Sequence, residues 1–496
     1  MTTPIDRPPA WVADAVFYQI FPDRFAASKR VDKPQGLEPW DDPPTLHGYK
    51  GGDLLGIVEH LDHLTDMGIT AVYLNPVFQS GSNHRYHTHD YYQVDPLLGG
   101  NDAFDELLAA CHDRGLRVIL DGVFNHASRG FFQFHDILEN GAGSPWRDWF
   151  HIHAWPLHPY GDGQPANYDA WWGLKALPKF NTDNPQVREF LMRVGEHWAG
   201  KGIDGWRLDV PEEIRTPGFW EEFRTRVRAV NPDLYIVGEI WANAAEFVTD
   251  GTRFDATMNY QFTTAVIAYA AGRRVDPTMT LDNPWYDIMP PVDAAGFGDR
   301  IERLLASYPT QAHMANLNLL DSHDTARILT IASGDAASVI LGLVLTLTFP
   351  GAPCIYYGTE IGMAGGRDPF SRGAFSWDPA TWDHDTLAAV KDLIDIRKAH
   401  GALRGPHYRR VWPPPGEHGT MLYVFERRSD EDDDGAADEV LVALNAGDAT
   451  ESLSLPLSDF PGHRLALLWG EAKVDHLDHH ARVVVPARSA AIWAVT

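Results

Sequence analysis

The chain has 496 residues, which is long for one ordinary domain, although a barrel with insertions takes up much of such a length. Its formal net charge of −27 argues against nucleic acid or an anionic membrane as a partner. Two cysteines cannot form a disulfide framework, and no secretory signal opens the sequence, so we expect a cytoplasmic protein.

Apolar stretches typical of buried strands alternate with helical patterns through most of the chain. Eight such strands are predicted, at 15–20, 71–76, 117–123, 207–210, 235–240, 254–259, 316–321 and 354–358. Helices are predicted between them, at 54–67, 103–115, 185–200, 217–230, 260–271, 298–307 and 334–348. This alternation predicts an α/β fold, specifically a (β/α)8 TIM barrel.

Two regions interrupt or follow the predicted barrel. Residues 127–184 have a loop-like composition and are expected to form an excursion domain after strand 3. Beyond an irregular loop at 364–382 and a helix at about 384–400, short strands separated by turns predict a C-terminal antiparallel β-sandwich. The expected domains are therefore 1–126 and 185–403 for the barrel, 127–184 for the excursion and 404–496 for the sandwich. The acidic run 430–434 is expected to be a solvated loop.

Four predicted strands end in, or are followed closely by, an acidic residue. These residues are Asp121, Asp209, Glu239 and Asp324, and His126 and His323 lie near two of them in the sequence. Strand ends of a parallel barrel open onto one face, where catalytic groups collect. We therefore expect the four carboxylates to converge.

Paired carboxylates suit the cleavage of a glycosidic bond, which needs a proton for the leaving oxygen and an anion beside the cationic sugar carbon. Arg207 and Asp209 are two residues apart, so on a strand they point to the same side, an arrangement that would hold Asp209 ionised as a nucleophile. Glu239 is then the better proton donor, and Asp324 adds negative charge against the transition state. The alternative for Arg207 and Asp209 is a salt bridge lining the barrel.

Two other chemistries fit the residues less well. The acids with His126 and His323 could ligate a metal, but the nearest histidine cluster (His84, His87 and His89) lies in a polar loop. Phosphate-sugar chemistry would require a helix start after a glycine-rich loop, which the segment 365–373 lacks. We predict no metal among the site residues.

With these residues in view, the chain resembles the α-amylase family of glycoside hydrolases. The motifs DGVFNH, GWRLDV, GEIW and LLDSHDT occur in the family's order, together with FYQIFPDRF and GAPCIYYGTEIG. The resemblance covers nearly the whole chain and implies a retaining double displacement. It implies that Asp209 is the nucleophile, Glu239 the acid/base and Asp324 the stabiliser of the transition state.

The resemblance also implies a set of substrate-binding residues. His126, Arg207 and His323 match positions that hold the sugar at the cleavage point, Tyr86 matches the aromatic platform beneath it, and Asp121 matches a structural acid. LPKFN at 177–181 and GGRDPFSRGAFSWD at 365–378 are similar to the cyclomaltodextrinase, neopullulanase and maltogenic amylase branch. In that branch, Trp241 would flank the leaving group, and Asp368 and Arg372 would bind sugar.

The chain departs from the branch at four places. The branch usually carries an N-terminal β-domain that helps it to dimerise, whereas this sequence begins almost at the first predicted barrel strand, so monomer and homodimer both stay open. His87 stands where the branch has Asp, and VPEE at 210–213 replaces VANE. AASKRVDKP after PDRF replaces a calcium-binding loop, and Asn125 matches a calcium ligand of secreted amylases without its partner acid. No cofactor is expected, and calcium is left open.

The predicted function is hydrolysis of α-1,4, with some α-1,6, glucosidic bonds in maltooligosaccharides, cyclodextrins or pullulan. An α-glucosyl transferase or an isomerase of the trehalose-synthase kind would use the same glycosyl-enzyme, and sequence does not reveal how well water is excluded. A third hypothesis is a non-catalytic carbohydrate-binding protein. The expected partner is an oligosaccharide, with no nucleic acid and no membrane.

Overall fold

The structure of the chain is a computed structural model that describes residues 7–280, 286, 290–430, 437–456, 464–477 and 479–496. Its central sheet holds eight parallel strands in the order β8-β7-β6-β5-β2-β1-β10-β9. A parallel bridge between Met258 and Leu317 brings the end of β8 to β9, so the sheet closes on itself. The predicted (β/α)8 barrel is confirmed. The strands are β1 (Phe17–Ile20), β2 (Ala71–Leu74), β5 (Arg117–Gly122), β6 (Gly205–Leu208), β7 (Tyr235–Gly238), β8 (Ala256–Thr257), β9 (Leu317–Leu319) and β10 (Ala352–Tyr356).

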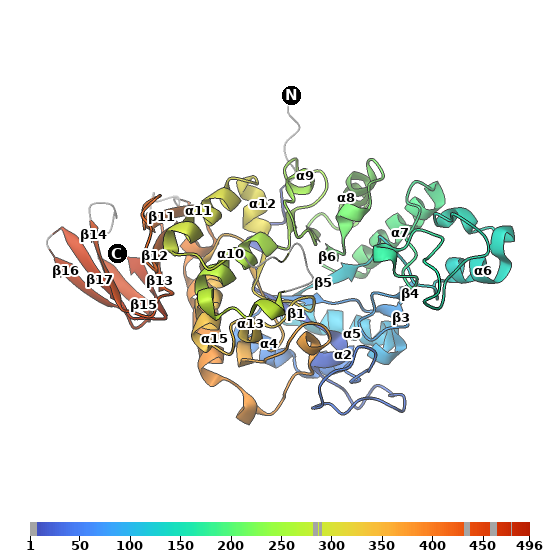
Figure 1. The fold of residues 1–496 in the computed structure, drawn as a ribbon, viewed down its shortest axis with the longest axis horizontal. Helices are drawn as coiled ribbons and strands as arrows, with labels where there is room; N and C mark the ends of the chain where they lie inside the picture. The colour runs from blue at the N-terminus through green and yellow to red at the C-terminus, as the bar shows by residue number, and fades with distance from the viewer. Residues whose placement is uncertain (1–6, 281–285, 287–289, 431–436, 457–463, 478) are drawn as a thin grey trace.

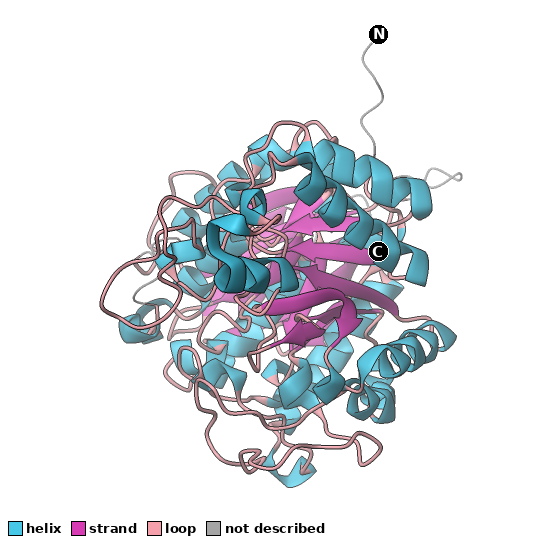
Figure 2. Cartoon of the chain, turned by 90° about the vertical axis from the view of Figure 1, so that its right-hand side faces the viewer, coloured by secondary structure: helices cyan, strands magenta, loops and turns pink. Residues whose placement is uncertain are grey.

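The barrel strands are apolar along almost their whole length because both of their faces are covered. All residues of β1, β2, β6 and β7 are buried. Figure 2 shows strands gathered at the centre with helices around them. The longer helices are α5 (Gly100–Asp113), α7 (Pro185–Lys201), α8 (Phe219–Val230), α10 (Tyr260–Ala270), α11 (Ala294–Leu305), α14 (Ala336–Thr348) and α15 (His384–Ala399).

Shorter helices complete the barrel: α1 (Trp11–Asp14), α2 (Pro22–Phe25), α9 (Ala245–Val248), α12 (Thr310–Ala315) and α13 (Ile328–Ile331). The helix predicted at 54–67 is two helices, α3 (Leu54–Glu59) and α4 (Leu61–Met67), because His60 leaves the helical region at φ −121° and ψ 13°. The break sets the His60 ring against Trp377, with 3.9 Å between the ring centroids. Within the described residues, no helix combines the length and apolar composition needed to cross a bilayer.

The segment between β5 and β6 leaves the barrel at one end of the molecule, where α6 (Phe132–Asn140) lies (Figure 1). This helix was not predicted from the loop-like composition. A bridge between His126 and Lys179 joins the two ends of the segment, and a second bridge joins Phe150 to Phe180. Phe131 and Phe134 pack against Phe150, so an aromatic cluster supplies the segment with a core of its own. A hairpin of β3 (Phe78–Ser80) and β4 (Thr88–Val94) follows β2.

Antiparallel strands form the opposite end of the molecule (Figure 1). One sheet has the order β11-β12-β13-β18-β15 and the other β14-β17-β16, and apolar residues of both share one buried cluster. This confirms the predicted antiparallel C-terminal fold, whereas the domain boundaries stay predictions. Of the acidic run 430–434, all but Asp430 lies outside the described residues. The strands are β11 (His407–Trp412), β12 (Leu422–Arg428), β13 (Glu439–Asn445), β14 (Glu451–Pro456), β15 (Leu465–Gly470), β16 (Lys473–Leu477), β17 (His480–Val485) and β18 (Ser489–Val495).

Candidate active site

The three predicted catalytic acids lie at the carboxyl ends of barrel strands. Asp209 directly follows β6 and Glu239 directly follows β7, while Asp324 lies in the loop after β9. Strands β6 and β7 are neighbours in which Leu208 pairs with Gly238, and the Glu239 amide donates to the Leu208 carbonyl at 2.9 Å. Asp209 and Glu239 each directly follow one residue of this pair, so the register places them side by side.

Arg207 lies at the centre of the carboxylates, and its side chain is fully buried. Its Nη1 lies 3.0 Å from Asp209 Oδ1 and 2.8 Å from Asp121 Oδ1. Its Nη2 lies 2.9 Å from Glu239 Oε2. One guanidinium therefore holds three buried carboxylates, two of which are the predicted nucleophile and proton donor.

A second network holds Asp324. His323 Nε2 lies 3.0 Å from Asp324 Oδ2 and 2.6 Å from the Tyr86 hydroxyl oxygen. The Tyr86 hydroxyl also donates to Asp121 Oδ2 at 2.8 Å, so this network meets the first one at Asp121. The rings of Tyr86 and His323 are stacked, with 4° between their planes. The Asp324 side chain remains 31% exposed, which leaves it open to a ligand.

Arg372 and Asp368 approach Asp324 from the segment after β10. Arg372 Nη2 lies 3.3 Å from Asp324 Oδ1, and its Nη1 lies 3.1 Å from Asp368 Oδ1. The Arg372 Nε also donates to the backbone carbonyl of His323 at 2.9 Å. The predicted sugar-binding pair is therefore joined to the third acid.

His126 and Trp241 lie at other parts of the site. His126 is buried, and its Nε2 has no hydrogen-bond partner among the residues that the structure describes. The pKa of His126 is lowered to about 3, mainly by burial and secondly by the nearby His87. The His126 ring is therefore neutral at neutral pH. The Trp241 indole N–H donates to Glu239 Oε1 at 3.1 Å, and the Trp241 ring stacks on Tyr260 at 3.6 Å.

Residues 19–400 match the family model described as alpha amylase, catalytic domain. The chain belongs to the α-amylase family. It is therefore a glycosidase, and the family's general mechanism retains the anomeric configuration.

Among curated relatives, a cyclomaltodextrinase of Bacillus sp is 42% identical over 91% of this chain and 76% of its own length. Neopullulanase 2 of Thermoactinomyces vulgaris is 39% identical over 84% of this chain and 68% of its own. The intracellular maltogenic amylase of Bacillus subtilis is 39% identical over 80% and 63%.

Solved structures of the family cover nearly all of the chain. A debranching enzyme from Nostoc punctiforme is 49% identical, with a TM-score of 0.89, over 98% of this chain and 99% of that one. The cyclic α-maltosyl-(1→6)-maltose hydrolase of Arthrobacter globiformis is 34% identical, with a TM-score of 0.84, over 98% and 100%. The α-amylase family fold thus extends through the C-terminal sheets.

The pKa values of the three acids in this site are shifted in different directions. Burial raises the pKa of Asp209 to about 7, assisted by Asp121 and opposed by Arg207. Burial also raises the pKa of Glu239 well above its ordinary 4.5, and the Asp209 charge adds to the effect. Burial opposes ionisation of Asp324 as well, but His323 and Arg372 lower its pKa below the ordinary value. Asp324 is therefore the acid that stays ionised.

Burial and Arg207 act in opposite directions on the pKa of Asp209. Arg207 does lower the pKa of Asp209, but it shares its charge with Asp121 and Glu239. Burial destabilises the Asp209 carboxylate more than the shared guanidinium of Arg207 stabilises it, so the pKa of Asp209 is raised. Ionisation of Asp209 then takes place near neutral pH.

Sequence reasoning missed three polar residues inside the barrel. The Tyr73 hydroxyl donates to Asp121 Oδ2 at 2.9 Å. Gln19 Nε2 lies 2.9 Å from His323 Nδ1 and donates to Asn75 Oδ1 at 3.0 Å. Gln19 and Asn75 are polar residues at the ends of apolar strands, the same signal that marks the acids, but neither carries a charge or an imidazole that would single it out.

The Gln19 contact fixes the tautomer of His323. An amide N–H is a donor, so the facing Nδ1 must accept, and a neutral His323 then carries its proton on Nε2. The Tyr86 hydroxyl donates to Asp121, so its oxygen accepts this N–H at 2.6 Å, and Asp324 Oδ2 lies 3.0 Å from the same Nε2. Gln19 therefore acts on the third acid through the imidazole.

Val210, directly after the predicted nucleophile, has a strained backbone with φ 36° and ψ 50°. A β-branched residue in the left-handed region costs of order 1–3 kcal/mol. In this conformation the Val210 N–H points to Glu239 Oε2, 3.3 Å away. The strain therefore provides a backbone donor to the predicted proton donor's carboxyl group.

Calcium does not fit the residues present around Lys33 or around Asn125. The Asp53 side chain is fully buried and forms an ion pair with the Lys33 ammonium at 2.8 Å. It also accepts hydrogen bonds from the backbone amides of Ser28 and Gly56. The Asn125 amide faces His126 Nδ1 at 3.2 Å. Across the described parts of the chain, no group of three or more His, Cys, Asp or Glu side chains is arranged to hold a metal ion. A lysine thus supplies the positive charge beside Asp53.

Proposed function

We propose that this chain hydrolyses α-1,4-glucosidic bonds of maltooligosaccharides, cyclodextrins and pullulan, with some action on α-1,6 bonds. The observation that carries the proposal is the shared contact of Asp209 and Glu239 with one buried guanidinium, because a nucleophile and a proton donor must be two carboxyl groups lying side by side. The names of the relatives support the substrate class. The name of the Bacillus subtilis relative supports a cytoplasmic location.

In the first step, an Asp209 oxygen forms a bond to the anomeric carbon while the bond to the leaving oxygen breaks. Glu239 transfers its proton to that oxygen, so the leaving sugar departs with a free hydroxyl. The charge that develops on the sugar is stabilised by Asp324, whose pKa is held low. The products of this step are a glycosyl ester on Asp209 and the Glu239 carboxylate.

In the second step, the Glu239 carboxylate takes a proton from water as the water oxygen attacks the anomeric carbon. The ester bond to Asp209 breaks, and two inversions leave the α configuration. His126 Nε2, which is buried and unpaired, together with Asp368 and Arg372, is proposed to bind sugar hydroxyls. Trp241 is proposed to flank the leaving group because its indole contacts Glu239.

A substrate panel tests the proposal. Purified protein is incubated with maltotriose, a cyclodextrin, panose and pullulan, and products are separated by chromatography. We expect glucose and maltose from the α-1,4 substrates, and panose cleavage reports α-1,6 action. Formation of trehalose from maltose would favour isomerisation instead, longer oligomers would favour transfer, and no cleavage of any substrate would contradict the proposal. The Asp209→Ala variant controls for a contaminating activity.

A further inference from the structure

The segment between β5 and β6 displays large aromatic side chains to solvent. Trp172 is 76% exposed, Tyr160 65% and Trp155 40%. Large aromatic rings dominate binding surfaces because they offer wide apolar faces at low conformational entropy. The position of these rings relative to the catalytic centre decides what they can bind.

A stack of three rings leads from the active site to solvent. The buried ring of His126 stacks on Trp171, with 5.4 Å between centroids and 21° between planes. Trp171 in turn stacks on Trp172, with 4.6 Å and 9°. Trp172 is therefore the exposed end of a ring stack whose buried end is a proposed sugar-binding residue.

The backbone holds Trp172 in an unfavourable conformation. Its φ of 50° and ψ of 23° lie in the left-handed region, which glycine occupies far more readily than tryptophan. Strained conformations persist where they position a functional group. At position 172 both the backbone strain and the exposure of the ring to solvent are unfavourable for tryptophan. In this conformation the Trp172 ring stacks on Trp171.

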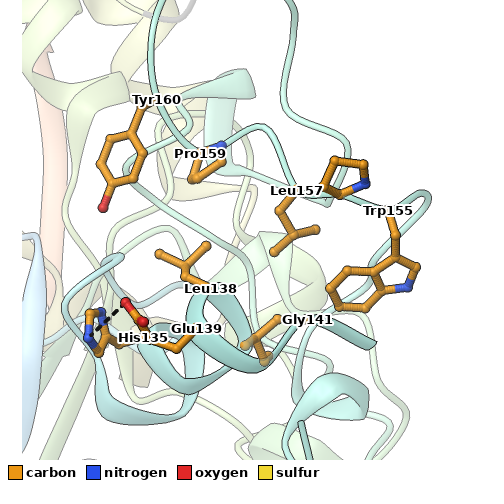
Figure 3. A pocket seen from close by; sticks show the side chains of 10 residues that line it. His135, Leu138, Glu139, Gly141, Trp155, Leu157, Pro159 and Tyr160 are labelled. Carbon is orange, nitrogen blue, oxygen red and sulfur yellow. Dashed lines mark ion pairs between the residues drawn. The ribbon is translucent and has the colours of Figure 1, made fainter. Parts of the chain in front are cut away.

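Two cavities are lined by residues of the same segment. One of about 430 Å³ is lined by Gly173, Leu174 and Lys175, which directly follow Trp172, and by Arg129 and Tyr160. A second of about 280 Å³ also includes Tyr160 among its lining residues. Figure 3 shows Tyr160 and Trp155 at opposite ends of the second cavity, with Leu138 and Leu157 between them.

Tyr160 is fixed although it is exposed. The guanidinium of Arg129 lies over its ring, 4.5 Å from the centroid, and also donates to the Pro159 carbonyl. Lys175 Nζ donates to the Tyr160 carbonyl at 3.3 Å. A ring held this way loses little entropy when a ligand stacks on its remaining surface.

We propose that Trp172 and Tyr160 form an outlying binding track for an α-glucan chain that extends out of the catalytic site. The inference rests on the proposed function, and it names a longer glucan as the occupant because the track begins at the ring stack of His126. Aromatic faces match the C–H faces of glucose rings, and the polar cavity lining (Arg129, Asp162, Gln164 and Lys175) matches their hydroxyls. Short substrates that fill only the catalytic site do not reach the track.

The test compares substrates of different length in two variants. Trp172→Gly and Tyr160→Ala are assayed on maltotriose and on a maltooligosaccharide of about ten glucose units. For each variant we expect KM on the long substrate to rise about 5- to 20-fold with kcat within twofold, and a smaller change on maltotriose. Phe132→Ala is the matched control, because Phe132 is 64% exposed in the same segment and lines neither cavity, and its ring packs against Trp146 outside the stack of His126, Trp171 and Trp172.

Thermal unfolding separates binding from folding. Glycine relieves the strain at position 172, so Tm of Trp172→Gly is expected to equal or exceed that of the wild type, and a purely structural role would lower it. If both variants keep the wild-type ratio of KM values for long and short substrates, the track is overturned while the proposed function stands. If the wild type cleaves no maltooligosaccharide, the proposed function itself fails.

Discussion

Asp209 and Glu239 are bound to the same guanidinium: Arg207 Nη1 lies 3.0 Å from Asp209 Oδ1, and Arg207 Nη2 lies 2.9 Å from Glu239 Oε2. A single cation cannot neutralise both carboxylates together with Asp121, and all of these groups are buried. The net negative charge favours a proton on one of the two acids. A retaining glycosidase needs one carboxylate and one carboxylic acid in this place, so the charge imbalance produces the required state.

The roles of the two acids can be separated with azide. Asp209→Gly and Glu239→Ala should each lose at least about 10⁴-fold in kcat on maltotriose. With azide and an activated α-maltosyl substrate, Asp209→Gly should form the β-glycosyl azide, since azide attacks in place of the missing nucleophile. Glu239→Ala should form the α-glycosyl azide, since azide attacks the glycosyl-enzyme. Proton NMR of the products assigns the anomers, and the reverse pattern would exchange the roles.

The pH profile should reflect the raised pKa of the nucleophile. Asp209 must be ionised to attack, and its pKa lies at about 7. We expect kcat/KM, which reports the free enzyme, to fall tenfold per pH unit on the acidic side of about 7. Loss of the Glu239 proton sets the basic limb. Initial rates on maltotriose from pH 4 to 10 provide the measurement, and an acidic limb centred below pH 5 would disagree.

Asp209→Asn should stabilise the protein at alkaline pH. The folded pKa of about 7 exceeds the unfolded value of about 3.9, so the native state loses stability as the pH rises from about 4 to about 7. Asparagine avoids this cost. We expect Tm to rise by roughly 2–4 °C at pH 8, with the gain shrinking as the pH approaches 4. Calorimetry at both pH values checks this, and a gain independent of pH would exclude ionisation as its cause.

Gln19→Glu should impair catalysis although residue 19 is not one of the catalytic acids. A carboxylate at position 19 can only accept a hydrogen bond from Nδ1, whereas the glutamine amide donates one to it. The substitution therefore favours the tautomer with the proton on Nδ1, or a charged His323, and disturbs the contact with Asp324. We expect kcat/KM to fall about 10- to 100-fold. Gln19→Met removes the donor without adding charge and should have a smaller effect. Nitrogen NMR of the histidine rings reports the tautomer, and an unchanged spectrum would reject the explanation.

Chelation should leave the stability of the protein unchanged. Lys33 already places a positive charge 2.8 Å from buried Asp53, so EDTA is expected to change Tm by less than about 1 °C. Lys33→Ala removes this cation and leaves a buried carboxylate with only backbone donors. We expect this variant to lose about 1–3 kcal/mol of stability. A large fall in Tm of the wild type in EDTA would show that a metal contributes to its stability.

The barrel and the positions of its acids could be predicted because both signals are local. A buried parallel strand requires an apolar run, and an acid at its end, as in GWRLDV and LYIVGEIW, marks where the chain meets solvent. The parallel order then brings Asp209, Glu239 and Asp324 to one rim, whatever their separation in sequence. Family motifs provided the roles of Tyr86, His126 and His323, which remain proposals for this chain.

Other features needed the folded molecule because they depend on neighbours distant in the sequence. Nothing near Asp209 in the chain shows that Arg207 is shared among three carboxylates, so the competition between burial and Arg207 at Asp209 could not be predicted. The contact of Gln19 with His323 joins residues 304 positions apart. Helix α6 and the exposed Trp172 ring depend on packing within one segment. The sequence alone determined which groups reach the barrel's catalytic rim; only tertiary packing decided their charge, because burial and shared partners set the free energy of ionisation.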